Sequence, residues 1–321
     1  MGLDPIVWFF VFGLLAGLAK AELRLPTAIY DFLSTVLLLS IGLKGGVELA
    51  KTPASGVGLD IVVVIGMGVV LTILAFGILR LGRLPRHDAA AIAAHYGSVS
   101  VATFAVGMAY LGRHEIAYEP TASVFLVVLE VPAILVGILL ARGGKAVDTS
   151  DPHATRGKGA WRELLHEVVL GRGIVLLIGG LLIGWASGPE GVKPIAPFFF
   201  DLFKGVLALF LVEMGLIAAS KLGGFLKYGL FLTAFAIATP LLFALIGVGT
   251  AMLIQLSPGG AILLATLAAS ASYIAVPAAM RTAIPAANPA MSLTAALAIT
   301  FPFNVVFGIP LYHRMVEWLY G

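Results

Sequence analysis

The sequence predicts an all-α polytopic membrane protein whose ten transmembrane helices form two inverted repeats of five. Three observations predict this fold class: the composition, the spacing of apolar runs, and a repeat at a nearly constant offset. Of the 321 residues, 60% are apolar and 12% are charged, and the mean hydropathy is +1.04. Globular domains average about 45–50% apolar and about 25% charged residues. The chain is therefore too apolar for a water-soluble protein.

The composition also excludes several kinds of chemistry. The sequence contains no cysteine, which excludes disulfides, thiolate metal sites and cysteine nucleophiles. The net charge is +3, and no basic cluster resembles a nucleic-acid-binding surface. We find no HExxH or GxSxG motif and no paired carboxylates in a polar span. An intramembrane enzyme is therefore the least favoured class, and no cofactor is expected.

Apolar runs long enough to cross a bilayer recur along the whole chain. The first run precedes Lys20, the first basic residue. A signal peptide carries its basic residues before the apolar run, so we expect a first transmembrane helix and no cleaved leader. The ten spans are predicted near 5–19, 28–50, 57–80, 88–111, 121–141, 172–187, 197–220, 226–254, 260–283 and 292–319.

One long hydrophilic stretch, at 141–167, divides the spans five and five. It predicts a first repeat at 1–141, a linker at 142–171 and a second repeat at 172–321. Its Gly, Asp, Ser, Thr and Pro content is typical of a flexible linker, and a short helix is expected at 161–168. Fourteen Lys and Arg residues lie in connections on the linker side and four on the other side. The positive-inside rule therefore places the linker in the cytoplasm and both termini outside.

The two halves resemble each other at an offset near 170. Residues 31–51 align with 201–221 at an offset of 170, and 93–102 align with 267–276 at 174. Pro132 and Pro302 are again 170 apart. Because each half contains an odd number of spans, the halves must lie in opposite orientations in the membrane. Such inverted repeats are typical of transporters, with a binding site near the midplane.

Two unusually polar segments, at 95–103 and 269–278, occupy corresponding positions in the fourth and ninth spans. Gly97 and Pro277 allow each helix to break, and a helix N-terminus at a break attracts an anion without a basic side chain. Alternatively, small residues here only let helices pack closely, with hydroxyls bonded to backbone carbonyls. The paired positions favour binding. Hydroxyl donors are supplied by Ser98, Ser100, Thr103, Ser270 and Ser272.

Glu130 lies in the middle of a span, where an ionised carboxylate costs about 2.5–3.5 kcal/mol. Because a carboxylate repels an anion, we interpret it as a Na⁺ ligand or near neighbour, with Thr300 and Asn304 supplying neutral oxygens. A protonated carboxyl bonded to a neighbouring helix is the alternative. His95 is expected to be neutral and bonded to one partner. Lys44 and Glu213 lie at nearly equivalent repeat positions and could form an ion pair across the repeat interface, where we favour a structural role over a chemical one.

Five segments carry a resemblance to a known family. They resemble the sodium-dependent bicarbonate transporters of the SbtA type over nearly all ten spans: AHYGSVSVATF (94–104), VLEVPAI (128–134), GPEGVKPIAPFFFDLFKGVLALFLVEMGLIAA (188–219), SPGGAILLATLAASASYIAVPAAMR (257–281) and ITFPFNVVFGIPLY (299–312). The resemblance implies a homotrimer in a bacterial plasma membrane. It also implies a core domain of spans 3–5 and 8–10, a gate domain of spans 1–2 and 6–7, and a PII-like regulator on the cytoplasmic face in some members.

The function that we expect is import of bicarbonate coupled to Na⁺ by alternating access. The alternatives are a Na⁺-coupled transporter of another small anion, such as a monocarboxylate or sulfate, and a membrane anion receptor that transports nothing. The bicarbonate site is predicted at Gly97, Ser98, Ser100, Thr103, Ser270, Ala271, Ser272 and Tyr273. The Na⁺ site is predicted at Glu130, Ser98, Thr103, Thr300 and Asn304.

Overall fold

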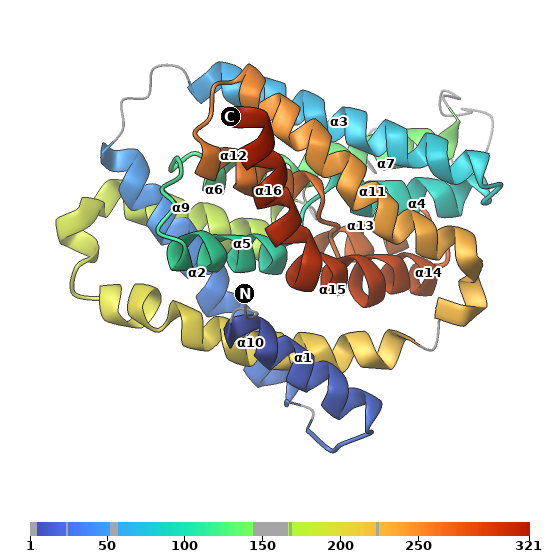
Figure 1. Cartoon of the computed structure of the whole chain (residues 1–321), viewed down its shortest axis with the longest axis horizontal. Helices are drawn as coiled ribbons and strands as arrows, with labels where there is room; N and C mark the ends of the chain where they lie inside the picture. The colour runs from blue at the N-terminus through green and yellow to red at the C-terminus, as the bar shows by residue number, and fades with distance from the viewer. Residues whose placement is uncertain (1–4, 24, 52–56, 144–165, 167–168, 223–224) are drawn as a thin grey trace.

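The computed structural model describes residues 5–23, 25–51, 57–143, 166, 169–222 and 225–321 (Figure 1). Every regular element in this part of the chain is helical. In chain order the helices are α1 (Pro5–Leu18), α2 (Thr27–Lys51), α3 (Val57–Leu81), α4 (Arg86–Gly97), α5 (Val101–Arg113), α6 (Ala122–Val128), α7 (Glu130–Arg142), α9 (Arg172–Val192), η1 (Pro197–Asp201), α10 (Phe203–Lys221), α11 (Phe225–Leu253), α12 (Pro258–Ala268), α13 (Ala275–Ala283), α14 (Pro289–Leu293), η3 (Thr294–Thr300), α15 (Phe301–Phe303), η4 (Asn304–Gly308) and α16 (Ile309–Tyr320). The elements labelled η are π-helical.

Eight helical stretches among the described residues are long and apolar enough to cross a membrane. They coincide with the predicted spans other than the first and the ninth. Those two coincide with shorter apolar helices, α1 and α12. The protein is therefore a multi-pass membrane protein, and the count of ten spans stays a prediction. The short helix expected at 161–168 falls almost wholly outside the described residues.

Four helices, α1, α2, α9 and α10, form one closely packed group. α1 packs along α10, α2 packs along α9, and α10 also contacts α2. Figure 1 shows α1 and α10 side by side along the lower edge. Gly13 of α1 lies against the backbone of Val212, and Gly42 of α2 lies against the backbone of Leu177, with no room for a β-carbon at either glycine. Small residues therefore let these backbones approach closely.

The remaining helices form a second group around the polar segments. α4 packs between α3 and α7, α12 packs on α11, and α11 contacts η3 and α3. Figure 1 shows α3 along the upper edge with α11 crossing beneath it. The two groups meet where α10 contacts η3 and α5, and where α2 contacts α6. The first group consists of the predicted spans 1, 2, 6 and 7, and its role as a gate stays a prediction.

The predicted ion pair between Lys44 and Glu213 is wrong. The Lys44 Nζ lies 5.6 Å from the ring centroid of Tyr118. The Glu213 Oε2 accepts a hydrogen bond from the Leu25 N–H at 3.1 Å. The Lys44 and Glu213 side chains therefore have different neighbours. Equivalent positions in two repeats need not be in contact with each other.

Candidate functional site

The fourth predicted span is broken at its centre. α4 ends at Gly97, Ser98 and Ser100 have extended backbone conformations, and α5 begins directly after Ser100. The Ser100 hydroxyl accepts a hydrogen bond from the Thr103 N–H at 3.2 Å and so caps α5. Gly97 lies against Thr72 of α3, where no β-carbon would fit. The Gly-Ser-Val-Ser sequence thus ends one helix and starts the next.

The ninth predicted span is also broken. Residues 269–274 separate α12 from α13. Within this break the Ser270 hydroxyl donates to the Leu267 carbonyl at 2.8 Å. The Ser272 hydroxyl accepts from the Val276 N–H at 3.5 Å, which is a long hydrogen bond. The prediction of two broken spans is confirmed.

Two hydrogen bonds tie the breaks to each other. The Ser100 N–H donates to the Ser270 hydroxyl at 2.9 Å. The Ser272 N–H donates to the His95 carbonyl at 2.8 Å. The ends of α4, α5, α12 and α13 therefore meet at one place, which we call the crossing.

The crossing gathers partial charges of both signs. A helix N-terminus carries roughly +0.5 charge and a C-terminus roughly −0.5. α5 and α13 present N-termini there, whereas α4 and α12 present C-termini. No Lys or Arg lies in 98–100 or 269–274. Helix ends alone therefore supply a place for an anion next to a place for a cation.

Two buried hydroxyls at the first break have no protein partner. Ser98 and Thr103 are each 1% exposed. Their hydroxyl oxygens make no hydrogen bond within the described part of the chain. A buried polar group left unpaired costs about 1–3 kcal/mol. A solute that bonds to both hydroxyls would remove that cost.

The other predicted anion residues also lie at the breaks. Ala271 is buried between Ser270 and Ser272, and its only polar groups are the backbone N–H and carbonyl. The Tyr273 ring packs edge-on against Phe301, with 5.6 Å between ring centroids. Its hydroxyl is buried and makes no hydrogen bond within the described part of the chain. The structure thus brings all eight predicted residues to the two breaks or the helical turns beside them.

Glu130 begins α7 and lies at the level of the first break. α4 and α7 run antiparallel, since the Arg86 Nε donates to the Leu140 carbonyl at 2.7 Å and Gly137 packs against Ala94. Gly68 of α3 lies against both the Gly97 carbonyl oxygen and the Leu129 side chain, so the start of α7 lies near the C-terminus of α4. The side chain is 4% exposed, and Oε2 has no hydrogen-bond partner among the described residues.

Thr300 is bonded to protein groups on both sides. Its hydroxyl donates to the Ala236 carbonyl at 2.7 Å. Since that bond uses the Thr300 proton, the Tyr96 hydroxyl, 2.6 Å away, donates to Thr300. Thr300 therefore connects α4 and α11 through the tenth predicted span.

Asn304 braces the second break. Its Nδ2 donates to the Ala269 carbonyl at 2.8 Å, and its Oδ1 accepts from the Tyr312 hydroxyl at 2.6 Å. The side-chain oxygens of Asn304 and Thr300 already accept one bond each, and their Na⁺ role stays a prediction. Sequence reasoning missed Tyr96 and Tyr312. Both tyrosines could have been singled out from the sequence, because each lies in an apolar span and a buried tyrosine hydroxyl usually needs a hydrogen-bond partner.

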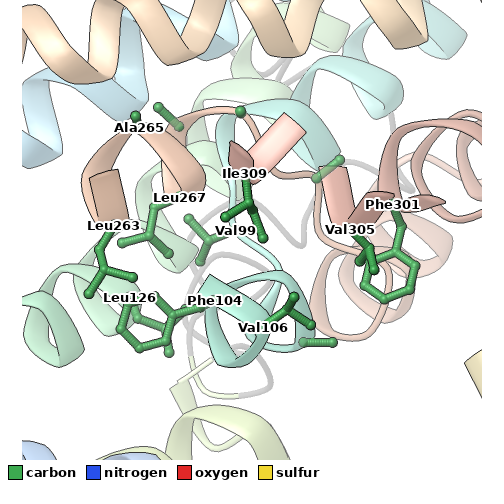
Figure 2. Packing of buried hydrophobic residues seen from close by; sticks show 14 of the residues in the cluster. Val99, Phe104, Val106, Leu126, Leu263, Ala265, Leu267, Phe301, Val305 and Ile309 are labelled. Atoms are coloured by element: carbon green, nitrogen blue, oxygen red, sulfur yellow. The ribbon is translucent and has the colours of Figure 1, made fainter. Parts of the chain in front are cut away.

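Apolar side chains enclose the crossing. Figure 2 shows Val99 of the first break in a buried cluster that includes Leu267, Phe301 and Ile309. Such surroundings strengthen electrostatic interactions because the local dielectric is low. Among the described residues no three His, Cys, Asp or Glu side chains group together in a way that could hold a metal ion. A Na⁺ site here would therefore depend on one carboxylate together with hydroxyl and carbonyl oxygens.

The fold and the crossing define a multi-pass membrane protein with two broken helices that meet at a buried polar centre. A family model described as the Na⁺-dependent bicarbonate transporter superfamily matches residues 5–317. The chain therefore belongs to this superfamily, which confirms the family predicted from its motifs. No curated protein shows significant similarity to the chain.

Proposed function

We propose that this protein is a secondary active transporter that imports bicarbonate together with Na⁺ by alternating access. Membership of the superfamily supports bicarbonate and Na⁺ as the solutes, and it favours transport over catalysis. The observation that carries the proposal is the pair of unpartnered hydroxyls, on Ser98 and Thr103, beside the N-terminus of α5.

The crossing suits a small anion. Bicarbonate carries its charge on oxygens that accept hydrogen bonds, and the Ser98 and Thr103 hydroxyls have protons to donate. The first N–H groups of a helix lack intrahelical partners, so α5 and α13 add donors. Without a Lys or Arg in either break, binding is weak enough to allow release. A transported solute must leave as readily as it enters.

Na⁺ fits next to the anion rather than in its place. Glu130 is buried at the start of α7, near the C-terminus of α4, where carbonyl oxygens and the helix dipole favour a cation. Oxygen ligands are those that hard cations prefer. Each ion lowers the electrostatic cost of binding the other, so the two affinities are coupled reciprocally.

The energetics favour coupled uptake. An inside-negative potential opposes entry of an anion by about 2.3 kcal/mol per 100 mV. One accompanying Na⁺ makes the transported pair neutral and removes that opposition. A tenfold Na⁺ gradient then supplies about 1.4 kcal/mol for uptake.

In this proposal the group containing the crossing moves as a core against the gate group of α1, α2, α9 and α10. Close glycine packing supports a rigid gate. The pairing of α1 with α10 and of α2 with α9 is the pattern that two inverted repeats related by a two-fold axis would produce. The proposal also includes ten spans, with both termini outside and the linker in the cytoplasm. It further includes assembly as a homotrimer and binding of a PII-like regulator.

Uptake of labelled bicarbonate into proteoliposomes tests the function. An inward Na⁺ gradient should give faster uptake than equal Na⁺ on both sides, and K⁺ in place of Na⁺ should abolish the stimulation. Equal rates in all three conditions would contradict the coupling. Inhibition by sulfate or a monocarboxylate at concentrations below that of bicarbonate would favour another anion. Na⁺-dependent binding without flux would favour a receptor.

A further inference from the structure

A small, mainly apolar cavity with a few polar groups lies on the side of the crossing where α4 begins and α13 ends. The positive-inside rule assigns that side to the cytoplasm. The cavity has a volume of about 130 Å³. A single water needs only about 10–15 Å³ of such space, so a small solute fits. Its lining includes Ala91, His95, Pro277, Met280, Arg281 and Ser292.

His95 lines this cavity and has one ring nitrogen without a partner in the described part of the chain. The His95 Nδ1 lies 2.7 Å from the Ala91 carbonyl oxygen. A carbonyl can only accept, so Nδ1 carries the proton, and Nε2 of the neutral ring offers a lone pair. The side chain is 2% exposed, and Nε2 has no partner in the part of the chain that the structure describes. A residue of the cavity lining thus carries a buried acceptor that lacks a donor among the described residues.

Arg281 adds a positive charge to the same cavity. The guanidinium is always charged and only donates hydrogen bonds. A solute that satisfies both groups must carry a negative charge and a hydrogen-bond donor, and in a small inorganic anion that donor is an O–H group. Nitrate and chloride have no O–H, a cation is repelled by Arg281, and water lacks the charge. An oxyanion that retains one proton has both properties.

The cavity also lies next to the crossing along the chain. The carbonyl of His95 accepts the Ser272 N–H that joins the two breaks, so one residue borders both places. Arg281 lies six residues beyond the start of α13, which is about 9 Å along the helix axis. A solute that leaves the crossing along α13 therefore meets His95 first and Arg281 next.

We propose that this cavity is a second site for a protonated oxyanion on the path from the crossing to the cytoplasm. The His95 Nε2 accepts the O–H of the anion, and Arg281 pairs with its charge. The inference rests on the proposed function, because bicarbonate is an anion of this class. It assigns His95 as a residue that selects for the O–H group, whereas the crossing selects for small size and charge.

Cysteine protection tests the site on the full-length chain, which has no native cysteine. Ala287→Cys places a thiol in the cavity lining, and Ala286→Cys places one on the exposed neighbouring residue as the matched control. At twice its dissociation constant, bicarbonate should slow alkylation of the first thiol about threefold and leave the control unchanged. Nitrate at the same concentration should protect less. Equal protection by the two anions, or none by bicarbonate, overturns the proposal.

Two further backgrounds separate this site from the crossing. His95→Phe should raise the half-protecting bicarbonate concentration about tenfold, because one lost hydrogen bond of about 1.4 kcal/mol has that effect. Arg281→Gln should raise it by a similar factor. Arg281 is exposed, so this second substitution leaves the core intact. Ser98→Ala should keep the protection, with or without Na⁺. Protection that disappears in Ser98→Ala belongs to the crossing and contradicts a second site. Failure of the proposed function gives a different result. In that case the wild-type protein would show this protection but no Na⁺-dependent uptake.

Discussion

The two breaks have similar sequences, but their hydroxyls have different partners. In the first break, the Ser98 and Thr103 hydroxyls are buried without a protein partner. In the second break, the Ser270 hydroxyl donates to Leu267 and accepts from Ser100, and the Ser272 hydroxyl accepts from Val276. At the first break the Ser98 and Thr103 hydroxyls are therefore available to a solute, whereas the serine hydroxyls of the second break hold the crossing together. The Tyr273 hydroxyl of the second break is also unpartnered among the described residues.

This difference assigns different roles to residues that the sequence places at equivalent repeat positions. Removing an unpartnered hydroxyl weakens solute binding and does not lower stability, because no protein hydrogen bond is lost. Removing a partnered hydroxyl leaves a buried donor or acceptor unpaired and lowers stability. Binding affinity and thermal stability, measured on the same variants, therefore distinguish the two breaks.

The largest effect is expected for Glu130→Gln. Truncating one member of a buried charge pair costs about 2–5 kcal/mol, which corresponds to a rise of about 30-fold or more in the half-saturating Na⁺ concentration. Na⁺ titration of bicarbonate uptake measures it. Glu190→Gln, on an exposed side chain, is the control. An unchanged Na⁺ requirement in Glu130→Gln would remove this carboxylate from the Na⁺ site.

Ser270→Ala should lower the free energy of unfolding by about 1–3 kcal/mol, because the Ser100 N–H loses its acceptor inside the crossing. The measurement is thermal unfolding of the purified protein in detergent. Ser220→Ala removes a similar local bond to a carbonyl at an exposed position and should change stability little. Equal unfolding temperatures for the two variants would mean that Ser270 does not brace the crossing.

Ser98→Ala should weaken bicarbonate binding about fivefold to tenfold, the range for one lost hydrogen bond of about 1–1.5 kcal/mol, without lowering the unfolding temperature. The hydroxyl has no protein partner to lose. Ser40→Ala, whose buried hydroxyl bonds to the Val36 carbonyl, is the matched control for affinity. A lower unfolding temperature with wild-type affinity would reverse the role assigned to Ser98.

Ser272→Ala should have the smallest effect, about twofold or less on affinity, because its hydroxyl makes only a long 3.5 Å bond. The Ser272 N–H, which bonds to His95, is unchanged by the substitution. Calorimetric titration with bicarbonate measures the affinity. A loss as large as that of Ser98→Ala would show that both breaks contact the anion through their serines.

The positions of the breaks could be predicted from sequence because polar residues within apolar runs are conspicuous. Pro277 was expected to allow the second break, yet it lies in the first turn of α13, after the break. A proline fits there because the first N–H groups of a helix have no intrahelical acceptor. The interactions of Thr300 with Tyr96 and Ala236 could not be predicted, because they join residues 204 and 64 positions apart. Their geometry depends on how whole helices pack.

Calorimetry of bicarbonate binding, with and without Na⁺, tests the central claim most directly. If both ions bind next to each other at the crossing, saturating Na⁺ should raise the bicarbonate affinity about tenfold or more, a coupling of about 1.4 kcal/mol or more. Bicarbonate should raise the Na⁺ affinity by the same factor. Bicarbonate affinities that are equal in Na⁺ and in K⁺ would contradict a shared site.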